Sequence, residues 1–199
     1  IIENLKTNKK LIKVIDLSIN KKFSRKKQNI NQIPNVLIIG TSINKNLENS
    51  IRSLKNIKCK LTIVGHIEQN YLNLLKKLNI NYQNYVGISN NKVINLYKQS
   101  DILLFASIYE GFGIPILEAQ KSGVPVVTSN LYPMKSVAGK GAYLVNPKNV
   151  RSIENGIKHI LHNKKLRKRL IKEGYENEKR FNKEIIIQKY IECYNELTF

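Results

Sequence analysis

Hydrophobic residues in this chain gather in short runs, and between the runs they recur at the three- and four-residue spacing of helices. A short continuous apolar run is typical of a strand buried on both faces, and helical spacing is typical of a helix with one face on a core. Because the two patterns alternate, the sequence predicts an α/β fold with a doubly wound parallel sheet of the Rossmann-like kind. The predicted strands are 36–39, 59–64, 82–86, 102–106, 126–129 and 142–145, and the chain from about residue 150 onward is predicted to be helical.

The stretch 101–130 combines several of these signals. Its predicted strand leads into a turn that contains Gly111 and Gly113. Pro115 suits the first turn of a helix, where its missing N–H has no partner in any case, and Gly123 suits the end of that helix. The predicted order is therefore strand, glycine turn, short helix, strand.

This order indicates a site for a phosphate with acidic groups beside it. The backbone N–H groups of Gly111–Ile114 would lie at a helix N-terminus, where the helix dipole favours negative charge. Glu110 precedes the turn and Glu118 follows one turn into the helix. An ionised carboxylate only accepts hydrogen bonds, and its two oxygens suit neighbouring hydroxyls of a sugar or ribose. A single glutamate in a short helix is usually a solvated surface residue, but the combination favours a sugar nucleotide.

The sequence E-G-F-G-I-P-I-L-E-A-Q-K-S-G-V-P-V-V-T-S-N, which begins at Glu110, closely resembles the E-x7-E segment of retaining glycosyltransferases of family 4. Those enzymes have the GT-B fold, so the resemblance implies that this chain is its C-terminal, donor-binding half. In the family the first glutamate contacts the donor sugar and the second contacts the ribose of the nucleotide. The resemblance assigns these roles to Glu110 and Glu118, and places the turn residues Gly111, Phe112, Gly113 and Ile114 near the sugar and phosphate.

The loop 40–46 follows the first predicted strand, at the sheet edge where open α/β sheets bind ligands. In this loop, Lys45 begins a Lys-Asn-Leu sequence that resembles the family's lysine element, whose ammonium binds the donor pyrophosphate and stabilises the leaving group. A lone loop lysine is usually solvated, but with the Glu110 segment present we interpret Lys45 as a ligand of the donor. The other nucleotide contacts expected are Gly40, Thr41, Gly87 and Ile88, of which the last two follow strand 82–86, beside the base in the family.

The chain departs from the family pattern in two places. Many members carry an arginine close to the lysine, where this chain has Thr41 and Asn44. The acid that often follows in the loop after residue 130 is replaced here by Ser136. If that acid supports the donor loop, its loss puts donor affinity or activity in question.

At 199 residues the chain is long enough for one well-buried α/β domain and too short for two nucleotide-binding domains. Residues 1–9 resemble the tail of a helix, 11–15 alternate like a strand, and 18–34 are polar and lysine-rich, as in a linker. In GT-B enzymes the final helix crosses back onto the first domain. The expected organisation is the end of a truncated N-terminal domain (1–16), an interdomain linker (17–34), the donor-binding domain (35–181) and a C-terminal crossover helix (182–199).

The net charge of +20, from 34 basic and 14 acidic residues, would ordinarily suggest nucleic acid or an anionic membrane as a partner. The lysines are scattered, and the densest run, 164–169, is most simply the solvated face of a helix. A second interpretation is peripheral contact with an anionic membrane, where each basic residue contributes about 1 kcal/mol. No nucleic-acid partner is expected, because aromatic and basic residues do not interleave on one face.

Cys59 and Cys193 are far apart in the sequence and lack metal-ligand spacing, so we interpret both as packing residues in a reduced setting. No run is long enough to span a membrane and no signal peptide is apparent. The expected location is the cytoplasm. The membrane interpretation adds association with the inner face of the membrane. No metal ion and no cofactor is expected beyond the substrate, a UDP- or GDP-sugar.

The resemblance implies a hexosyl-type transferase that moves a sugar to a glycan or lipid-linked glycan with retention of configuration, as in polysaccharide or lipopolysaccharide biosynthesis. We expect this chain alone to bind donor but to transfer little, because the acceptor site belongs to the first domain. Two alternatives remain open: a non-catalytic nucleotide-binding module or inactive fragment, and a basic nucleic-acid binder. The module would show no transfer even with a first domain supplied, and the binder would show steeply salt-dependent affinity for DNA or RNA.

Overall fold

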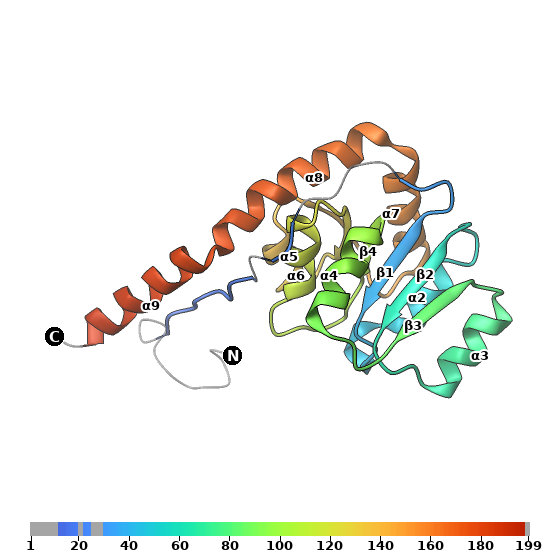
Figure 1. The fold of residues 1–199 in the computed structure, drawn as a ribbon, viewed down its shortest axis with the longest axis horizontal. Coiled ribbons are helices and arrows are strands. Elements are labelled where there is room, and N and C mark those ends of the chain that lie inside the picture. The colour runs from blue at the N-terminus through green and yellow to red at the C-terminus, as the bar shows by residue number, and fades with distance from the viewer. Residues whose placement is uncertain (1–11, 20–21, 25–29, 198–199) are drawn as a thin grey trace.

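A six-stranded parallel sheet forms the centre of the computed structural model, which describes residues 12–19, 22–24 and 30–197 (Figure 1). The strand order is β3-β2-β1-β4-β5-β6, so the chain starts in the middle, winds outward to β3 and returns to lay β4 beside β1. Open sheets of this order bind ligands outside the carboxyl ends of the strands where the winding reverses. The strands are β1 (Asn35–Ile39), β2 (Lys60–Val64), β3 (Tyr82–Tyr85), β4 (Ile102–Phe105), β5 (Val126–Ser129) and β6 (Ala142–Val145).

Helices cover both faces of the sheet. One face packs against α2 (Leu47–Ser53), α3 (Gln69–Lys77) and α7 (Val150–His162). The other face packs against α4 (Asn90–Gln99), α5 (Ile114–Lys121) and α6 (Met134–Ala138). The other elements in the described part of the chain are the 3-10 turns η2 (Ile43–Lys45) and η3 (Lys179–Phe181), and the helices α8 (Lys164–Glu178) and α9 (Lys183–Leu197).

Burial explains why the strands read as apolar runs. Every residue of β4 and β5 is buried, because these central strands have helices on both faces. The edge strand β3 is half-buried or exposed along its length. Four helices are preceded by a polar residue whose side chain accepts from a backbone N–H of the first turn: Ser89 before α4, Asn149 before α7, Asn163 before α8 and Asn182 before α9.

Helices α5 and α8 approach each other closely because small residues line their contact. A Cβ at Gly174 of α8 would lie 2.9 Å from Cγ of Gln120. A Cβ at Gly141, in the turn before β6, would collide with the backbone of Gly174 and with the Gln120 side chain. Buried polar groups connect the same elements: Asn177 donates to Gln120 Oε1 at 2.9 Å and to Val137 O at 2.8 Å. The helix that follows the glycine turn is therefore fixed by both steric fit and hydrogen bonds.

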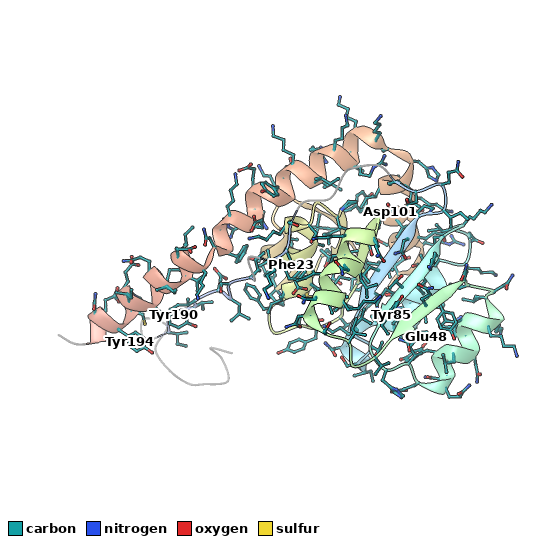
Figure 2. All side chains as sticks on the ribbon, in the orientation of Figure 1. Phe23, Glu48, Tyr85, Asp101, Tyr190 and Tyr194 are labelled. Carbon is teal, nitrogen blue, oxygen red and sulfur yellow. The ribbon has the colours of Figure 1, made fainter. Side chains whose placement is uncertain are left out.

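The last helix, α9, projects away from the sheet as an arm, beside residues 12–19 (Figures 1 and 2). Lys189 forms an ion pair with Asp16 at 3.4 Å, and Lys13 pairs with Glu196. The apolar side chains that α9 exposes are Ile185, Ile187, Tyr190, Ile191 and Tyr194. No helix in the described part of the chain is both long and apolar enough to cross a membrane.

The predicted fold class is confirmed, and the strands 126–129 and 142–145 have the predicted bounds. Two local predictions differ from the structure. Residues 12–15 are irregular rather than a strand, because they pair with no strand of the described sheet, and 1–11 lie outside the described residues. The expected loop around Ser136 is the short helix α6, because Met134, Val137 and Ala138 turn a buried face to the core.

We expect Gly141→Ala to destabilise the domain by about 1–3 kcal/mol, since overpacking forces a backbone shift at the α5–α8 contact. The thermal midpoint would fall by about 2–4 °C for each 1 kcal/mol. The matched control is Gly111→Ala, because the added Cβ there meets no atom within 4 Å. Equal midpoints for both variants would contradict the close-packing account.

Candidate functional site

Two loops meet at the carboxyl ends of β1 and β4, where the winding of the sheet reverses. Gly40 follows β1 and has a φ of +87°, a conformation that favours glycine. A Cβ at Gly40 would lie 2.7 Å from Cε of Lys45, so the bare backbone there leaves room for the lysine stem. Thr41 packs against Gly65, the residue after β2, in the same way, with Oγ1 2.7 Å from where a Cβ would stand.

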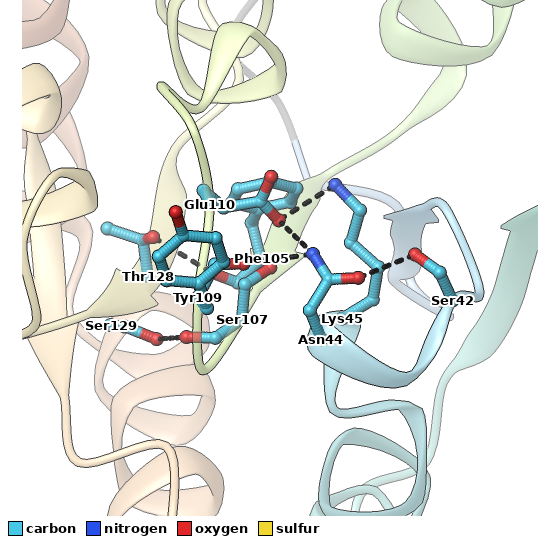
Figure 3. A network of polar contacts seen from close by, with 9 residues as sticks. All are labelled: Ser42, Asn44, Lys45, Phe105, Ser107, Tyr109, Glu110, Thr128 and Ser129. Carbon is cyan, nitrogen blue, oxygen red and sulfur yellow. Dashed lines mark hydrogen bonds and ion pairs between the residues drawn. The ribbon is translucent and has the colours of Figure 1, made fainter.

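Lys45 and Glu110 form an ion pair across these loops, with 2.8 Å between Nζ and Oε1 (Figure 3). The two side chains are only 17% and 11% exposed. The ammonium also lies 4.7 Å from the centre of the Phe105 ring, within cation–π range. A positive and a negative group therefore share one sparsely solvated position at the edge of the sheet.

Asn44 connects the two loops through hydrogen bonds. Its Nδ2 donates to Tyr109 O at 2.9 Å and lies 3.5 Å from Glu110 Oε1, while Ser42 Oγ donates to its Oδ1 at 2.8 Å. Its backbone oxygen accepts from Ile108 N–H at 2.8 Å. In the sequence, Asn44 was noticeable only as the replacement for an arginine. Its position beside Lys45 was the one available signal for its role.

Side chains of β5 support the loop after β4. Thr128 Oγ1 donates to Phe105 O at 2.8 Å, and Ser129 Oγ donates to Ser107 O (Figure 3). All four residues are buried. The loop that carries Glu110 therefore starts from a rigid base.

The glycine turn delivers the N-terminus of α5 to the same edge. Gly113 caps the helix with a φ of +111°. Its carbonyl accepts a hydrogen bond from Ile116 N–H at 3.0 Å, at the start of the helix. The amides of Gly113 and Ile114 precede that bond, so they have no acceptor within α5. Phe112 packs edge-on against Phe181 of η3, with ring centres 5.8 Å apart. The Phe112–Phe181 contact thus anchors the turn beside these two amides.

A cleft of about 610 Å³ lies beside the turn. Its walls are 110–115 on one side and 14–17 on the other. Asp16 in the second wall is the residue paired with Lys189 of α9. Residues 14–17 were not predicted to reach this site, because an irregular segment far away in sequence carries no signal of where it packs.

Glu118 lies one turn into α5 and meets a buried tyrosine. Tyr97 of α4 is fully buried, and its hydroxyl donates to Glu118 Oε2 at 2.8 Å. Burial raises the pKa of Glu118 above its ordinary value, against the opposing effect of the Tyr97 hydrogen bond. Burial and the neighbouring carboxylate raise the pKa of Tyr97 well above its usual range. Tyr97 was not predicted as a site residue.

The loop after β3 lies at the same edge of the sheet, but β2 separates it from β1. Gly87 has a φ of +63°, and Ile88 is half-buried in the apolar cluster that also includes Phe112. Neither residue joins the Lys45–Glu110 network. Ser136, where the family often has an acid, is exposed on α6. In the described residues no group of three or more His, Cys, Asp or Glu side chains is placed to hold a metal ion.

Comparison with protein families finds a match to the family described as "Glycosyl transferases group 1" over residues 20–177. The matched range contains all six strands, the Lys45 loop and the glycine turn. It ends at Asn177, the buried residue that ties α8 to α5.

Curated relatives extend beyond this chain. It is 32% identical over 160 residues to the O-antigen chain mannosyltransferase RfbU of Salmonella typhimurium, covering 75% of this chain and 44% of the relative. It is 27% identical over 194 residues to the N,N'-diacetylbacillosaminyl-diphospho-undecaprenol alpha-1,3-N-acetylgalactosaminyltransferase of Campylobacter jejuni, covering 94% of this chain and 51% of the relative. The chain thus spans about half the length of these relatives.

A solved structure shares the fold. Sucrose-phosphate synthase from Thermosynechococcus elongatus matches with a TM-score of 0.83 and 22% identity, over 94% of this chain and 52% of that chain. At this identity the likeness shows the fold alone.

We expect Glu118→Gln to stabilise the protein at pH 7. An acid whose pKa is higher in the folded state binds its proton more tightly there than in the unfolded state. The free energy of unfolding therefore falls as the pH rises from the unfolded-state pKa, about 4.3, through the folded-state pKa. The cost of the ionised group persists at pH 7, and glutamine removes it while still accepting from Tyr97. The thermal midpoint would rise by about 2–4 °C for each 1 kcal/mol relieved.

The gain should shrink as the pH approaches 4, where the wild-type carboxyl is mostly protonated in both states. Thermal unfolding at both pH values checks this, with Glu68→Gln as the control for losing one negative charge at an exposed position. A lower midpoint for Glu118→Gln at pH 7, or a gain that grows toward pH 4, would contradict the account.

Proposed function

The chain belongs to the glycosyl transferases group 1 family, and from that premise we propose that it forms the donor-binding half of a retaining glycosyltransferase. The observation that carries the proposal is the Lys45–Glu110 contact beside the N-terminus of α5, where the winding of the sheet reverses. A cation and helix amides at one position suit a diphosphate, and a carboxylate next to them suits a hydroxylated sugar.

The diphosphate of a UDP- or GDP-sugar binds Lys45 and the amides of Gly113 and Ile114. The α5 dipole adds to the attraction, because these amides are at its positive end. As the sugar–phosphate bond breaks, negative charge grows on the leaving diphosphate. Lys45 and the amides are already in place to neutralise it, which is electrostatic stabilisation of the transition state.

The two glutamates bind the hydroxyls of the donor. Glu110 accepts from the sugar and holds it in reacting geometry, and Glu118 accepts from the ribose. Neither is assigned as a nucleophile. Gly40 and Thr41 line the phosphate side, and Gly87 and Ile88 lie toward the base. The donor requires no metal ion in this proposal, since Lys45 supplies the positive charge.

The acceptor is proposed to be a glycan or a lipid-linked glycan. One relative is named as acting on an O-antigen chain and another on a diphospho-undecaprenol-linked sugar. Such an acceptor places the enzyme in polysaccharide or lipopolysaccharide assembly at the cytoplasmic face of a membrane. In this organisation 1–16 end the first domain, 17–34 are the linker, and α9 carries the chain back toward that domain.

The first turns of α8 expose basic side chains that suit anionic lipid head groups at such a membrane. Sedimentation with vesicles of anionic lipid tests this contact, and absence of binding at low salt would remove it from the proposal. The exposed side chains are Lys164, Lys165, Lys168 and Arg169.

The direct test is calorimetric titration of the chain with UDP and with GDP. We expect saturable binding to one of them and about 10- to 100-fold weaker binding to Glu118→Ala, because hydrogen bonds to a charged group are worth about 1.5–3 kcal/mol. The control is Glu68→Ala, which removes an exposed carboxylate outside the site. Binding of neither nucleotide, or equal binding by both variants, would contradict the proposal.

A further inference from the structure

Tyr97 is a buried polar residue that the proposed reaction does not use. It is 0% exposed, and its hydroxyl is 2.8 Å from Glu118 Oε2 and 3.4 Å from Pro115 O. A phenylalanine would fill the same core volume without burying a hydroxyl, which costs free energy unless it is hydrogen-bonded. The hydroxyl therefore has a specific partner, and that partner is the carboxylate assigned to the ribose.

A residue from the segment before the sheet holds the Tyr97 ring. Phe23 packs on it edge to face, with ring centres 5.4 Å apart and planes at 82°. Phe23 is 5% exposed and lies over the α4 and α5 side of the sheet, where Figure 2 labels it. With the ring fixed between this contact and its own helix, the position of the hydroxyl is set before any ligand arrives.

The hydrogen bond also leaves one carboxylate oxygen for a ligand. Tyr97 occupies Oε2, and in the described part of the chain no hydrogen bond to Oε1 of Glu118 is formed. Because Glu118 is half-buried, its ionised form needs a donor, and the tyrosine supplies it. A carboxylate held by one oxygen accepts through the other in a defined direction.

We propose that Tyr97, braced by Phe23, is a positioning residue that orients Glu118 toward the ribose hydroxyls and so makes the site selective for ribonucleotides. The inference rests on the proposed function, since it assumes that Glu118 meets a ribose. A site built to bind a hydroxyl discriminates against an analogue that lacks it, because its own polar group is then left without a partner. A less firmly held Glu118 should therefore reduce the discrimination between ribo and dideoxy nucleotides more than it reduces the affinity for nucleotides in general.

The test compares Tyr97→Phe with wild type by calorimetric titration of four probes: UDP, GDP and their 2',3'-dideoxy forms. For the base that binds, we expect the ratio of ribo to dideoxy affinity to fall about three- to tenfold in the variant. Affinity for the dideoxy probe should stay nearly unchanged, since it makes no contact with Glu118. A purely structural role would weaken both probes in proportion and leave the ratio unchanged.

Tyr143→Phe is the matched control, because it deletes a tyrosine hydroxyl that bonds His159 on the opposite face of the sheet. Phe23→Leu is the second variant, and it should lower the ratio in the same direction while the hydroxyl remains. If the wild-type chain binds and both Tyr97→Phe and Phe23→Leu keep its ratio of ribo to dideoxy affinity, the inference is overturned while the proposed function stands. Failure of the wild-type chain to bind any of the four probes would overturn the proposed function and this inference with it.

Discussion

The contact between Lys45 and Glu110 joins the two loops on which the rest of the site depends. Removing both charges from water is costly, and a sparsely solvated ion pair is therefore weak support for stability. Two features offset the cost here: the Asn44 amide beside the carboxylate and the Phe105 ring under the ammonium. The pair lies at the edge where open parallel sheets bind ligands, and the strands β1 and β4 set the separation of its two loops. In the proposed function these two side chains are the binding groups for the donor.

The scaffold fixes the second part of the site by close packing. Gly174 lets α8 approach α5, Gly141 in the turn before β6 fits against Gly174, and Asn177 fills the contact with hydrogen bonds to Gln120 and Val137. Phe181 then meets Phe112 in the glycine turn. Because α5 carries both the helix amides and Glu118, packing far from the ligand edge determines where those groups stand. Rigid support of this kind is what precise binding geometry requires.

The sequence was most informative where one physical cause acts on adjacent residues. Burial on both faces made β4 a continuous apolar run, and the glycine turn with Pro115 indicated the start of α5. It was least informative where residues distant in the chain meet. Tyr97 and Glu118, or Asn44 and Tyr109, pair only through the fold, so no local pattern indicates them. Helix α6 was missed because five residues after a proline are too few to show a helical period.

A crystal structure of the chain with bound UDP or GDP would test the central claim most directly. Our account predicts phosphate oxygens at hydrogen-bond distance, about 2.7–3.2 Å, from Lys45 Nζ and from the Ile114 amide, with the ribose hydroxyls at Glu118. A nucleotide ordered elsewhere on the chain, or a diphosphate that touches neither Lys45 nor the N-terminus of α5, would contradict it.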